Sequence, residues 1–145
     1  MKIRNSLVAA ADKARNDAYA PYSGFKVGVA VLSSDGRVFT GANVENASFG
    51  ATICAERVAV ASAVAAGARS FDLIAVVTGE ALPVFPCGIC RQFLSEFGDM
   101  EIICTGTSGK IVSTRLKDLI PNAFSYKGRV TAGEMKKTSG RAAKK

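Results

Sequence analysis

Two uninterrupted apolar runs constrain the fold of this chain more than any other feature. They are "FDLIAVVTG" at residues 71–79 and "EIICTG" at residues 101–106. Neither run shows the alternation of apolar and polar residues that marks a strand with one face in water. Strands of this kind occur where both faces of a sheet are covered. We therefore expect two buried strands in a sheet that carries helices on each side.

The first half of the chain supplies a helix and a hairpin. Apolar and small residues recur at helical spacing over residues 4–18, and Pro21 ends the pattern. The segment "KVGVAVLSSDGRVFTGANVE", residues 26–45, reads as two strands joined by a turn at Ser34-Asp35-Gly36. Residues 54–67 then predict an Ala- and Val-rich helix that Gly67 closes.

The second half continues the alternation of strands and helices. Residues 90–98 predict a shorter helix ending at Gly98, residues 110–114 a last strand, and residues 115–121 a short helix stopped by Pro121. The main order is α-β-β-α-β-α-β-β, with strand-helix-strand crossovers in the middle. One mixed sheet between helices, an α/β fold, is the simplest way to bury these elements.

Length and charge indicate one domain and a tail. The 145 residues suffice for one compact core, and we find no repeat. Of the net charge of +7, +6 belongs to residues 127–145, which hold seven Lys or Arg and one Glu. We expect one folded domain over residues 1–126 and a flexible, solvated basic tail over 127–145. Weak binding of nucleic acid by that tail is the alternative.

Location and membrane contact follow from the same composition. Gly, Arg or Glu interrupts every long apolar stretch, so we expect no membrane span. The amino-terminal segment carries charges throughout and lacks the apolar core of a signal peptide, which favours the cytoplasm.

The cysteines and the lack of histidine narrow the chemistry. The chain has Cys54, Cys87, Cys90 and Cys104, and no histidine. Histidine triads, imidazole bases and histidine-containing metal sites are therefore excluded. In a cytosolic chain, Cys-x-x-Cys favours metal or redox chemistry over a structural disulfide. No thioredoxin-like order of strand and motif precedes this pair.

Three of the cysteines fit an open metal site. Cys54 and Cys87 each begin a predicted helix, where unpaired N–H groups favour a thiolate, and Cys90 follows one turn later. Three thiolates without histidine indicate zinc, and three ligands leave a position for water. Cys104 lies in an apolar strand and is expected to pack as a core residue. A closed site with Cys104 as the fourth ligand is the alternative.

Two residues that follow Cys54, Glu56 and Arg57, can assist the chemistry of a metal site. Zinc lowers the pKa of bound water, and the negative charge of three thiolates opposes this effect. Arg57 can offset that charge by donating to the sulfurs. Glu56 is poorly placed as a fourth ligand and is predicted to move the proton of the water. Alone on a helix, it would be an ordinary surface charge.

The motif "CAER" followed by "PCGICRQ" resembles the zinc-dependent cytidine deaminases. The segments "YAPYSGFKVGVA", "TGANVENASF" and "LIPNAF" resemble the small homotetrameric branch that acts on nucleosides, and the resemblance covers about residues 5–126. It implies the three-layer α/β/α fold of that family and one zinc ion per subunit. The implied reaction is hydrolytic deamination of cytidine and 2′-deoxycytidine to uridine and 2′-deoxyuridine in pyrimidine salvage.

The resemblance also assigns residues. It makes Cys54, Cys87 and Cys90 the zinc ligands and Glu56 the proton shuttle. It also implies substrate contacts: Asn43 and Glu45 would bind the sugar hydroxyls, and Phe25 would stack on the face of the base. The backbone around Ala55 and Pro86 would contact the polar edge of the base, and Phe124 would reach the site of a neighbouring subunit. Without the resemblance, Asn43 and Glu45 would be a strand end and turn, and the two phenylalanines would be core or covering residues.

Two departures and three rivals accompany this hypothesis. Phe49 stands where the family usually has tyrosine, and the tail is longer than the resemblance requires. A deaminase of the blasticidin S type would share the metal site and differ in the sugar pocket. A polynucleotide deaminase usually has histidine as its first ligand and a basic groove. A structural zinc module would close its site with Cys104 and bind nucleic acid through the tail.

Overall fold

The two apolar runs form adjacent strands at the centre of one sheet. The computed structural model describes residues 2–126, so the predicted tail at 127–145 lies outside the described residues. Strands β3 (Phe71–Thr78) and β4 (Glu101–Thr105) pair in parallel within a five-stranded sheet of order β2-β1-β3-β4-β5. In β3 every residue except Asp72 is buried. The prediction of strands covered on both faces is therefore confirmed.

The hairpin lies beside β3. Strands β1 (Val27–Ser33) and β2 (Val38–Ala42) are antiparallel, and Gly36 takes a φ of +91° in the turn between them. Strand β1 also pairs antiparallel with β3, so β2 and β3 run in the same direction. The edge strand β5 (Ile111–Arg115) is antiparallel to β4. The mixed sheet that the element order predicted is confirmed.

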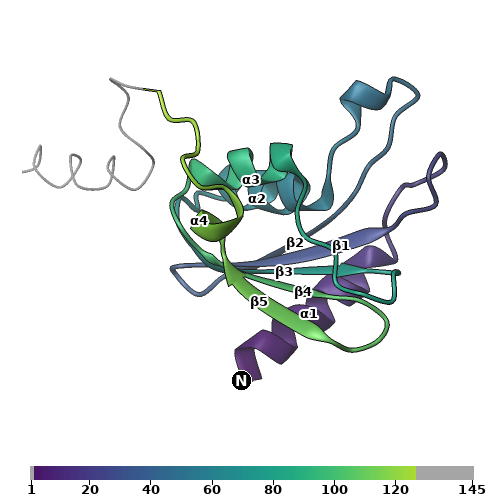
Figure 1. Ribbon diagram of the computed structural model, residues 1–145, viewed down its shortest axis with the longest axis horizontal. Coiled ribbons are helices and arrows are strands. Elements are labelled where there is room, and N and C mark those ends of the chain that lie inside the picture. Colours follow the sequence, from purple (N-terminus) through teal and green to yellow (C-terminus); the bar gives the residue numbers. More distant parts are fainter. Residues whose placement is uncertain (1, 127–145) are drawn as a thin grey trace, which may run out of the picture.

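Helices cover both faces of this sheet. Helix α1 (Lys2–Arg15) lies on one face, and α2 (Ala55–Ala65), α3 (Gly88–Ser95) and α4 (Leu116–Leu119) lie on the other (Figure 1). A single 3₁₀ turn, η1 (Phe49–Ala51), interrupts the long segment between β2 and α2. The arrangement is a three-layer α/β/α sandwich. In the part of the chain that the structure describes, no helix is long and apolar enough to cross a membrane.

Helices α1 and α3 have bounds that differ from the prediction. Helix α1 ends at Arg15 rather than at residue 18, because the next residues turn and Tyr19 pairs with Val44 in an isolated bridge. Helix α3 spans residues 88–95 rather than 90–98, and Gly98 follows it with a φ of +92°. Both differences arise where backbone pairing or a left-handed glycine ends the helix before its apolar pattern does.

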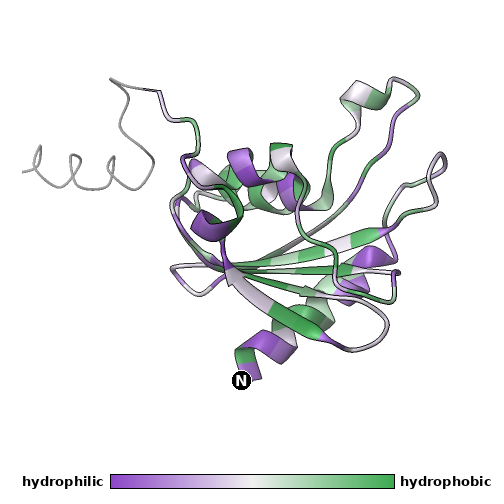
Figure 2. Cartoon of the chain, viewed as in Figure 1, coloured by the Kyte–Doolittle hydropathy of each residue, from purple (hydrophilic) through white to green (hydrophobic). Residues whose placement is uncertain are grey.

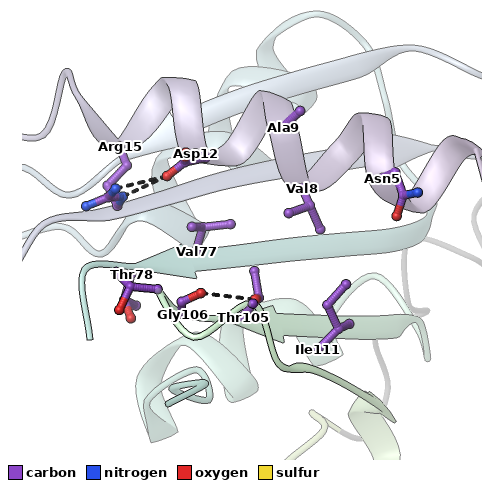
Figure 3. A pocket seen from close by; sticks show the side chains of 12 residues that line it. Asn5, Val8, Ala9, Asp12, Arg15, Val77, Thr78, Thr105, Gly106 and Ile111 are labelled. Atoms are coloured by element: carbon purple, nitrogen blue, oxygen red, sulfur yellow. Dashed lines mark hydrogen bonds and ion pairs between the residues drawn. The ribbon is translucent and has the colours of Figure 1, made fainter. Parts of the chain in front are cut away.

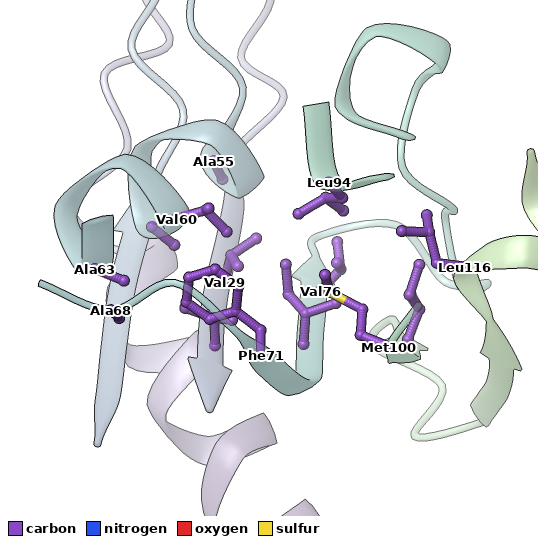
Figure 4. Close-up of a cluster of buried hydrophobic side chains, with 14 of the residues drawn as sticks. Val29, Ala55, Val60, Ala63, Ala68, Phe71, Val76, Leu94, Met100 and Leu116 are labelled. Carbon is purple, nitrogen blue, oxygen red and sulfur yellow. The ribbon is translucent and has the colours of Figure 1, made fainter. Parts of the chain in front are cut away.

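The core has one part on each face. The larger cluster joins α2, α3 and α4 to the sheet and includes Val60, Phe71, Val76, Leu94 and Met100 (Figure 4). On the opposite face α1 packs Leu7 and Ala11 against β1, β3 and β4. Figure 2 shows the corresponding pattern, with apolar residues concentrated along the central strands.

Two glycines allow the hairpin to lie close to its covering helices. A Cβ atom on Gly28 would stand 1.9 Å from the carbonyl oxygen of Ala11 in α1. A Cβ atom on Gly41 would stand 2.5 Å from the backbone nitrogen of Ala59 in α2. Such contacts are far below van der Waals separation, so only glycine fits at these positions.

The topology brings two helix N-termini to one end of the sheet. Both Ala42 of β2 and Val77 of β3 stand opposite Gly28, so the carboxyl ends of β2 and β3 lie at the same edge. Helices α2 and α3 begin beyond these ends, with Cys54 and Cys87 as their N-cap residues. Ligand sites of α/β sheets form at such edges.

Candidate active site

Three cysteine sulfurs meet where the two helices begin. The Sγ atoms of Cys54, Cys87 and Cys90 all lie within 4.8 Å of one another, and Cys54 Sγ lies 3.8 Å from Cys87 Sγ. A tetrahedral zinc ion with Zn–S bonds of about 2.3 Å separates its sulfur ligands by about 3.8 Å. The donor set and its spacing therefore fit zinc. Among the residues that the structure describes, this is the one cluster of its kind.

Cys104 is not part of this cluster. It is fully buried in β4 and belongs to the larger core cluster. Burial raises the pKa of its thiol to about 12, so the thiol stays neutral at ordinary pH. Cys104 therefore packs as a small apolar residue, as expected, and the alternative of a closed four-thiolate site finds no support in the geometry.

The three sulfur atoms also interact directly with one another. The Cys90 thiol donates a hydrogen bond that lowers the pKa of Cys54 to about 5, and Arg57 and Cys87 contribute to the same shift. The hydrogen bond to Cys54 and burial raise the pKa of Cys90. One thiolate is thus favoured from the start, and a bound dication would favour the ionised form of all three.

Arg57 lies against the cysteine that precedes it by three residues. One of its terminal nitrogens donates to the carbonyl oxygen of Thr52 at 3.1 Å and lies 3.9 Å from Cys54 Sγ. Its Nε is buried without a hydrogen-bond partner among the described residues. The predicted cation beside the sulfurs is therefore present, and its position offsets part of the thiolate charge.

Glu56 is buried beside the cluster. Its side chain is 5% exposed, and its Oε2 lies 3.6 Å from Cys90 Sγ. Burial raises the pKa of this carboxyl, because the charged form loses its hydration. A carboxyl with a raised pKa next to a metal site can accept and return a proton near neutral pH. It is not the solvated surface charge that Glu56 alone would suggest.

A cavity of about 350 Å³ opens onto Glu56, Cys54 and Cys87. Four of the residues predicted to contact substrate line it: Phe25, Asn43, Glu45 and Ala55. The charged residues in its wall are Glu45 and Glu56, and its lining includes neither lysine nor arginine. A cavity of this size holds a small organic molecule.

Two predicted contact residues lie outside this cavity. Pro86 is buried, and its carbonyl oxygen accepts a hydrogen bond from Arg91 Nε at 2.7 Å. Phe124 is 73% exposed, and its carbonyl oxygen accepts from Gln92 Nε2 at 2.9 Å. Within one chain Phe124 is therefore not brought to the site, and only a second chain could place it there.

Asn43 and Glu45 have structural partners that the sequence did not reveal. Asn43 accepts from the Val27 N–H and donates to the Phe25 carbonyl oxygen, both at 2.8 Å. Glu45 accepts from the backbone N–H groups of Tyr22 and Ser23 at 3.0 and 3.1 Å, and from the Ser23 hydroxyl. These side chains thus hold the segment around Phe25 as well as facing the cavity.

Sequence reasoning missed several residues of the cavity wall. Ser23, Thr52, Val84 and Phe85 also line it. Ser23 lies inside the segment "YSGF", and Phe85 immediately precedes "PCGIC", so proximity to the motifs was the available signal. Proximity alone does not say which side chains point inwards.

A second, larger cavity lies on the opposite face of the sheet (Figure 3). Its volume is about 540 Å³, and it lies between α1 and the ends of β3 and β4. Its charged residues, Asp12 and Arg15, pair with each other at 3.0 Å. It contains no cysteine and no buried carboxyl, so it offers no comparable chemistry.

Comparison with known proteins agrees with the site. Residues 1–106 match the family model described as the cytidine and deoxycytidylate deaminase zinc-binding region. A cytidine deaminase of Sporosarcina psychrophila is 47% identical over 121 residues, which are 82% of this chain and 89% of that protein.

The solved structures give the same result. The crystal structure of a cytidine deaminase from Burkholderia pseudomallei superposes with a TM-score of 0.80 at 50% identity, covering 83% of this chain and 98% of that one. A blasticidin-S deaminase of Bacillus cereus is more distant, at 31% identity over 68% of this chain and 76% of that protein. The chain therefore belongs to the cytidine and deoxycytidylate deaminase family of zinc-binding hydrolases.

Proposed function

We propose that this protein hydrolyses cytidine and 2′-deoxycytidine to uridine and 2′-deoxyuridine with release of ammonia. The observation that carries the proposal is the buried Glu56 carboxyl, 3.6 Å from Cys90 Sγ and open to a cavity of about 350 Å³. The relatives at 47% and 50% identity, both cytidine deaminases, support the same substrate class.

Cys54, Cys87 and Cys90 would hold the zinc ion, which supplies an acidified water as the nucleophile for C4 of the base. Glu56 takes up a proton from the nucleophile and passes it to N3 of the pyrimidine. Glu56 then moves a second proton to the amino nitrogen, so that the C4–N bond breaks and ammonia leaves. One C–O bond forms and one C–N bond breaks, with no change in oxidation state.

The cavity wall supports recognition of a nucleoside base. Phe25 is half-buried in that wall and can stack on the pyrimidine. Its backbone is held on both sides by hydrogen bonds, which keeps the ring in place without a ligand. The backbone around Ala55 and Pro86 would contact the polar edge of the base. Ala55 is given this role because it lines the cavity, whereas Pro86 does not line it although its neighbours Phe85 and Cys87 do.

A count of hydrogen bonds supports binding of one sugar hydroxyl. A carboxylate offers about four acceptor sites, and an amide offers two donors and two acceptors. Three bonds from the segment at residues 22–23 occupy Glu45, and two occupy Asn43. Glu45 keeps one acceptor, and Asn43 keeps one donor and one acceptor. A single hydroxyl group can donate to the free acceptor of Glu45 and accept from the free donor of Asn43.

The charge of the site favours a nucleoside over a nucleotide. Glu45 lines the cavity and would contact the sugar, and no lysine or arginine lines the cavity to offset a phosphate. A 5′-phosphate would add negative charge beside this carboxylate. The proposal therefore excludes deoxycytidylate as a good substrate.

The assembly is part of the proposal. Phe49 and Phe124 are each 73% exposed, and Ile89 is 66% exposed. Large apolar side chains at such exposure mark a surface that another chain can cover. We infer a homotetramer in which Phe124 reaches a neighbouring site. The catalytic domain of each subunit comprises residues 1–126, followed by the basic tail of residues 127–145. We further infer that the enzyme works in the cytoplasm, in pyrimidine salvage.

The proposal is tested by stoichiometry and metal dependence. Purified protein should convert cytidine to uridine with one ammonia released per turnover. Removal of the metal with a chelator should abolish the reaction, and added zinc should restore it. Faster turnover of blasticidin S or deoxycytidylate than of cytidine would contradict the proposed substrate.

A further inference from the structure

Ser23 lies between the carboxylate proposed for the sugar and the ring proposed for the base. Its hydroxyl donates to Glu45 Oε2 and accepts the backbone N–H of Phe25 at 2.9 Å. The direction of this relay is fixed, because a carboxylate can only accept a hydrogen bond and an amide N–H can only donate one. Ser23 therefore connects the two halves of the site through one oxygen atom.

The Ser23 hydroxyl also limits how Glu45 can turn. The main cavity, which is the one of about 350 Å³ that opens onto Glu56, shares Ser23, Glu45 and Thr52 with a third cavity of about 390 Å³. The third cavity is also lined by the edge-to-face pair of Tyr22 and Phe49, whose ring centres are 5.7 Å apart. A carboxylate that borders two cavities has more than one orientation open to it. Two backbone N–H groups bind its Oε1, whereas the Ser23 hydroxyl binds its Oε2.

The charge of Glu45 follows the same contact. The Ser23 hydroxyl is the largest of the influences that lower the pKa of this carboxyl, ahead of the backbone N–H groups. The carboxylate is thus kept ionised and kept as an acceptor. The bond from the Ser23 hydroxyl fixes the orientation of Glu45 Oε2, which carries the one acceptor site that remains free.

We propose that Ser23 is a positioning residue for sugar recognition: its hydroxyl orients Glu45 so that the free acceptor meets a sugar hydroxyl, and ties that contact to the backbone of Phe25. The inference rests on the proposed function, since it assumes a nucleoside in the main cavity. It assigns Ser23 no contact with the reacting atoms.

The test measures how strongly the protein prefers a nucleoside that carries the 3′-hydroxyl of the sugar over one that lacks it. We compare kcat/KM for 2′-deoxycytidine and 2′,3′-dideoxycytidine in the parent, Ser23→Ala, Ser23→Thr and Ser34→Ala. Ser34 is the matched control, because its hydroxyl donates to the Asp72 carboxylate at 2.7 Å on an exposed surface outside the cavity. Calorimetric titration with 2′-deoxyuridine and 2′,3′-dideoxyuridine gives the same ratio from binding alone.

We expect Ser23→Ala to change the ratio of kcat/KM between 2′-deoxycytidine and 2′,3′-dideoxycytidine, and not only the rate on each nucleoside. Ser23→Ala should reduce the preference for the hydroxylated nucleoside about tenfold, the effect of one lost hydrogen bond to a carboxylate. Ser23→Thr should restore it, and Ser34→Ala should leave it at the parent value. An equal loss on both nucleosides in Ser23→Ala would overturn the inference, because a purely structural role lowers both. Turnover by the parent tests the proposed function separately.

Discussion

Glu56 Oε2 and Cys90 Sγ lie 3.6 Å apart, although 34 residues separate them in the chain. The contact exists because α2 and α3 begin at the same edge of the sheet. It places the Glu56 carboxyl, whose pKa is raised, against a proposed zinc ligand. Glu56 itself does not belong to the cluster of three cysteines that would hold the metal. An acid–base group needs this position, close to the metal but free to exchange a proton.

Arg57 should hold the metal through charge. Replacing it with glutamine removes the cation 3.9 Å from Cys54 Sγ and the bond to the Thr52 carbonyl oxygen. We expect zinc to pass to a chelator about tenfold faster, since a charged hydrogen bond is worth about 1.5–3 kcal/mol. Arg57→Lys keeps the charge, so its rate of zinc loss should lie between those of the parent and Arg57→Gln. Parent-like zinc retention in Arg57→Gln would show that the guanidinium does not act on the site.

Arg91 should hold the loop that leads to Cys87. Its Nε donates to the Pro86 carbonyl oxygen at 2.7 Å, and its Nη1 donates to the Leu119 carbonyl oxygen at 2.9 Å. Arg91→Ala should lower the melting temperature by roughly 5 °C and also accelerate zinc loss, because the loop before a ligand becomes mobile. Both effects can be read from one preparation by thermal unfolding and chelator challenge.

Arg69 provides the matched control for Arg91. Its Nη1 donates to the carbonyl oxygens of Val64 and Ala68, both at 2.8 Å, and neither lies in the cavity wall. Arg69→Ala should lower the melting temperature but leave zinc retention unchanged. If both alanine variants lost zinc at the same rate, Arg91 would have no special connection to the metal site.

Cys104 should be dispensable for metal binding. Cys104→Ser introduces a hydroxyl into a fully buried position and should cost about 1–3 kcal/mol of stability. Zinc content per chain should remain at the parent value, whereas Cys90→Ser should lower it. Metal analysis of the two folded variants decides the point, and zinc loss in Cys104→Ser would revive a closed four-thiolate site.

Gly28 should be essential for the packing of α1. A Cβ atom there would stand 1.9 Å from the Ala11 carbonyl oxygen, so Gly28→Ala must displace the helix, at a cost of about 3 kcal/mol. Gly50 is the control, because a Cβ atom on it meets nothing within 4 Å. Equilibrium unfolding at saturating zinc compares the two. Equal stability of the two alanine variants would contradict the described packing of α1 on β1.

Much of the architecture could be predicted because it depends on local patterns. The apolar run at residues 71–79, the turn at Ser34-Asp35-Gly36 and the helix start after Cys54 each appear where the sequence indicates, and α3 begins two residues before the predicted range of 90–98. The zinc cluster could be predicted for the same reason, since two helix N-termini that follow parallel strands share an edge. Helix ends were less accurate, because contacts such as the Tyr19–Val44 bridge decide them.

The finer contacts of the site could not be predicted from sequence. Asn43 and Glu45 bind the segment at residues 22–27, and this depends on how two loops meet beyond the sheet. The role of Arg91 likewise depends on the Leu119 carbonyl oxygen, 28 residues away in the chain. Phe124 stands apart from the cavity because its predicted place requires a second chain.

The central claim is that Glu56 moves protons and does not hold the metal. Glu56→Gln keeps the size of the side chain and removes its ability to accept a proton, and Glu96→Gln, on an exposed residue after α3, is the control. Zinc content per chain and initial rate of cytidine deamination are measured on the same samples. The account predicts full zinc content and a rate about 1,000-fold or more below the parent for Glu56→Gln. A parent-like rate in a zinc-loaded Glu56→Gln protein would contradict it.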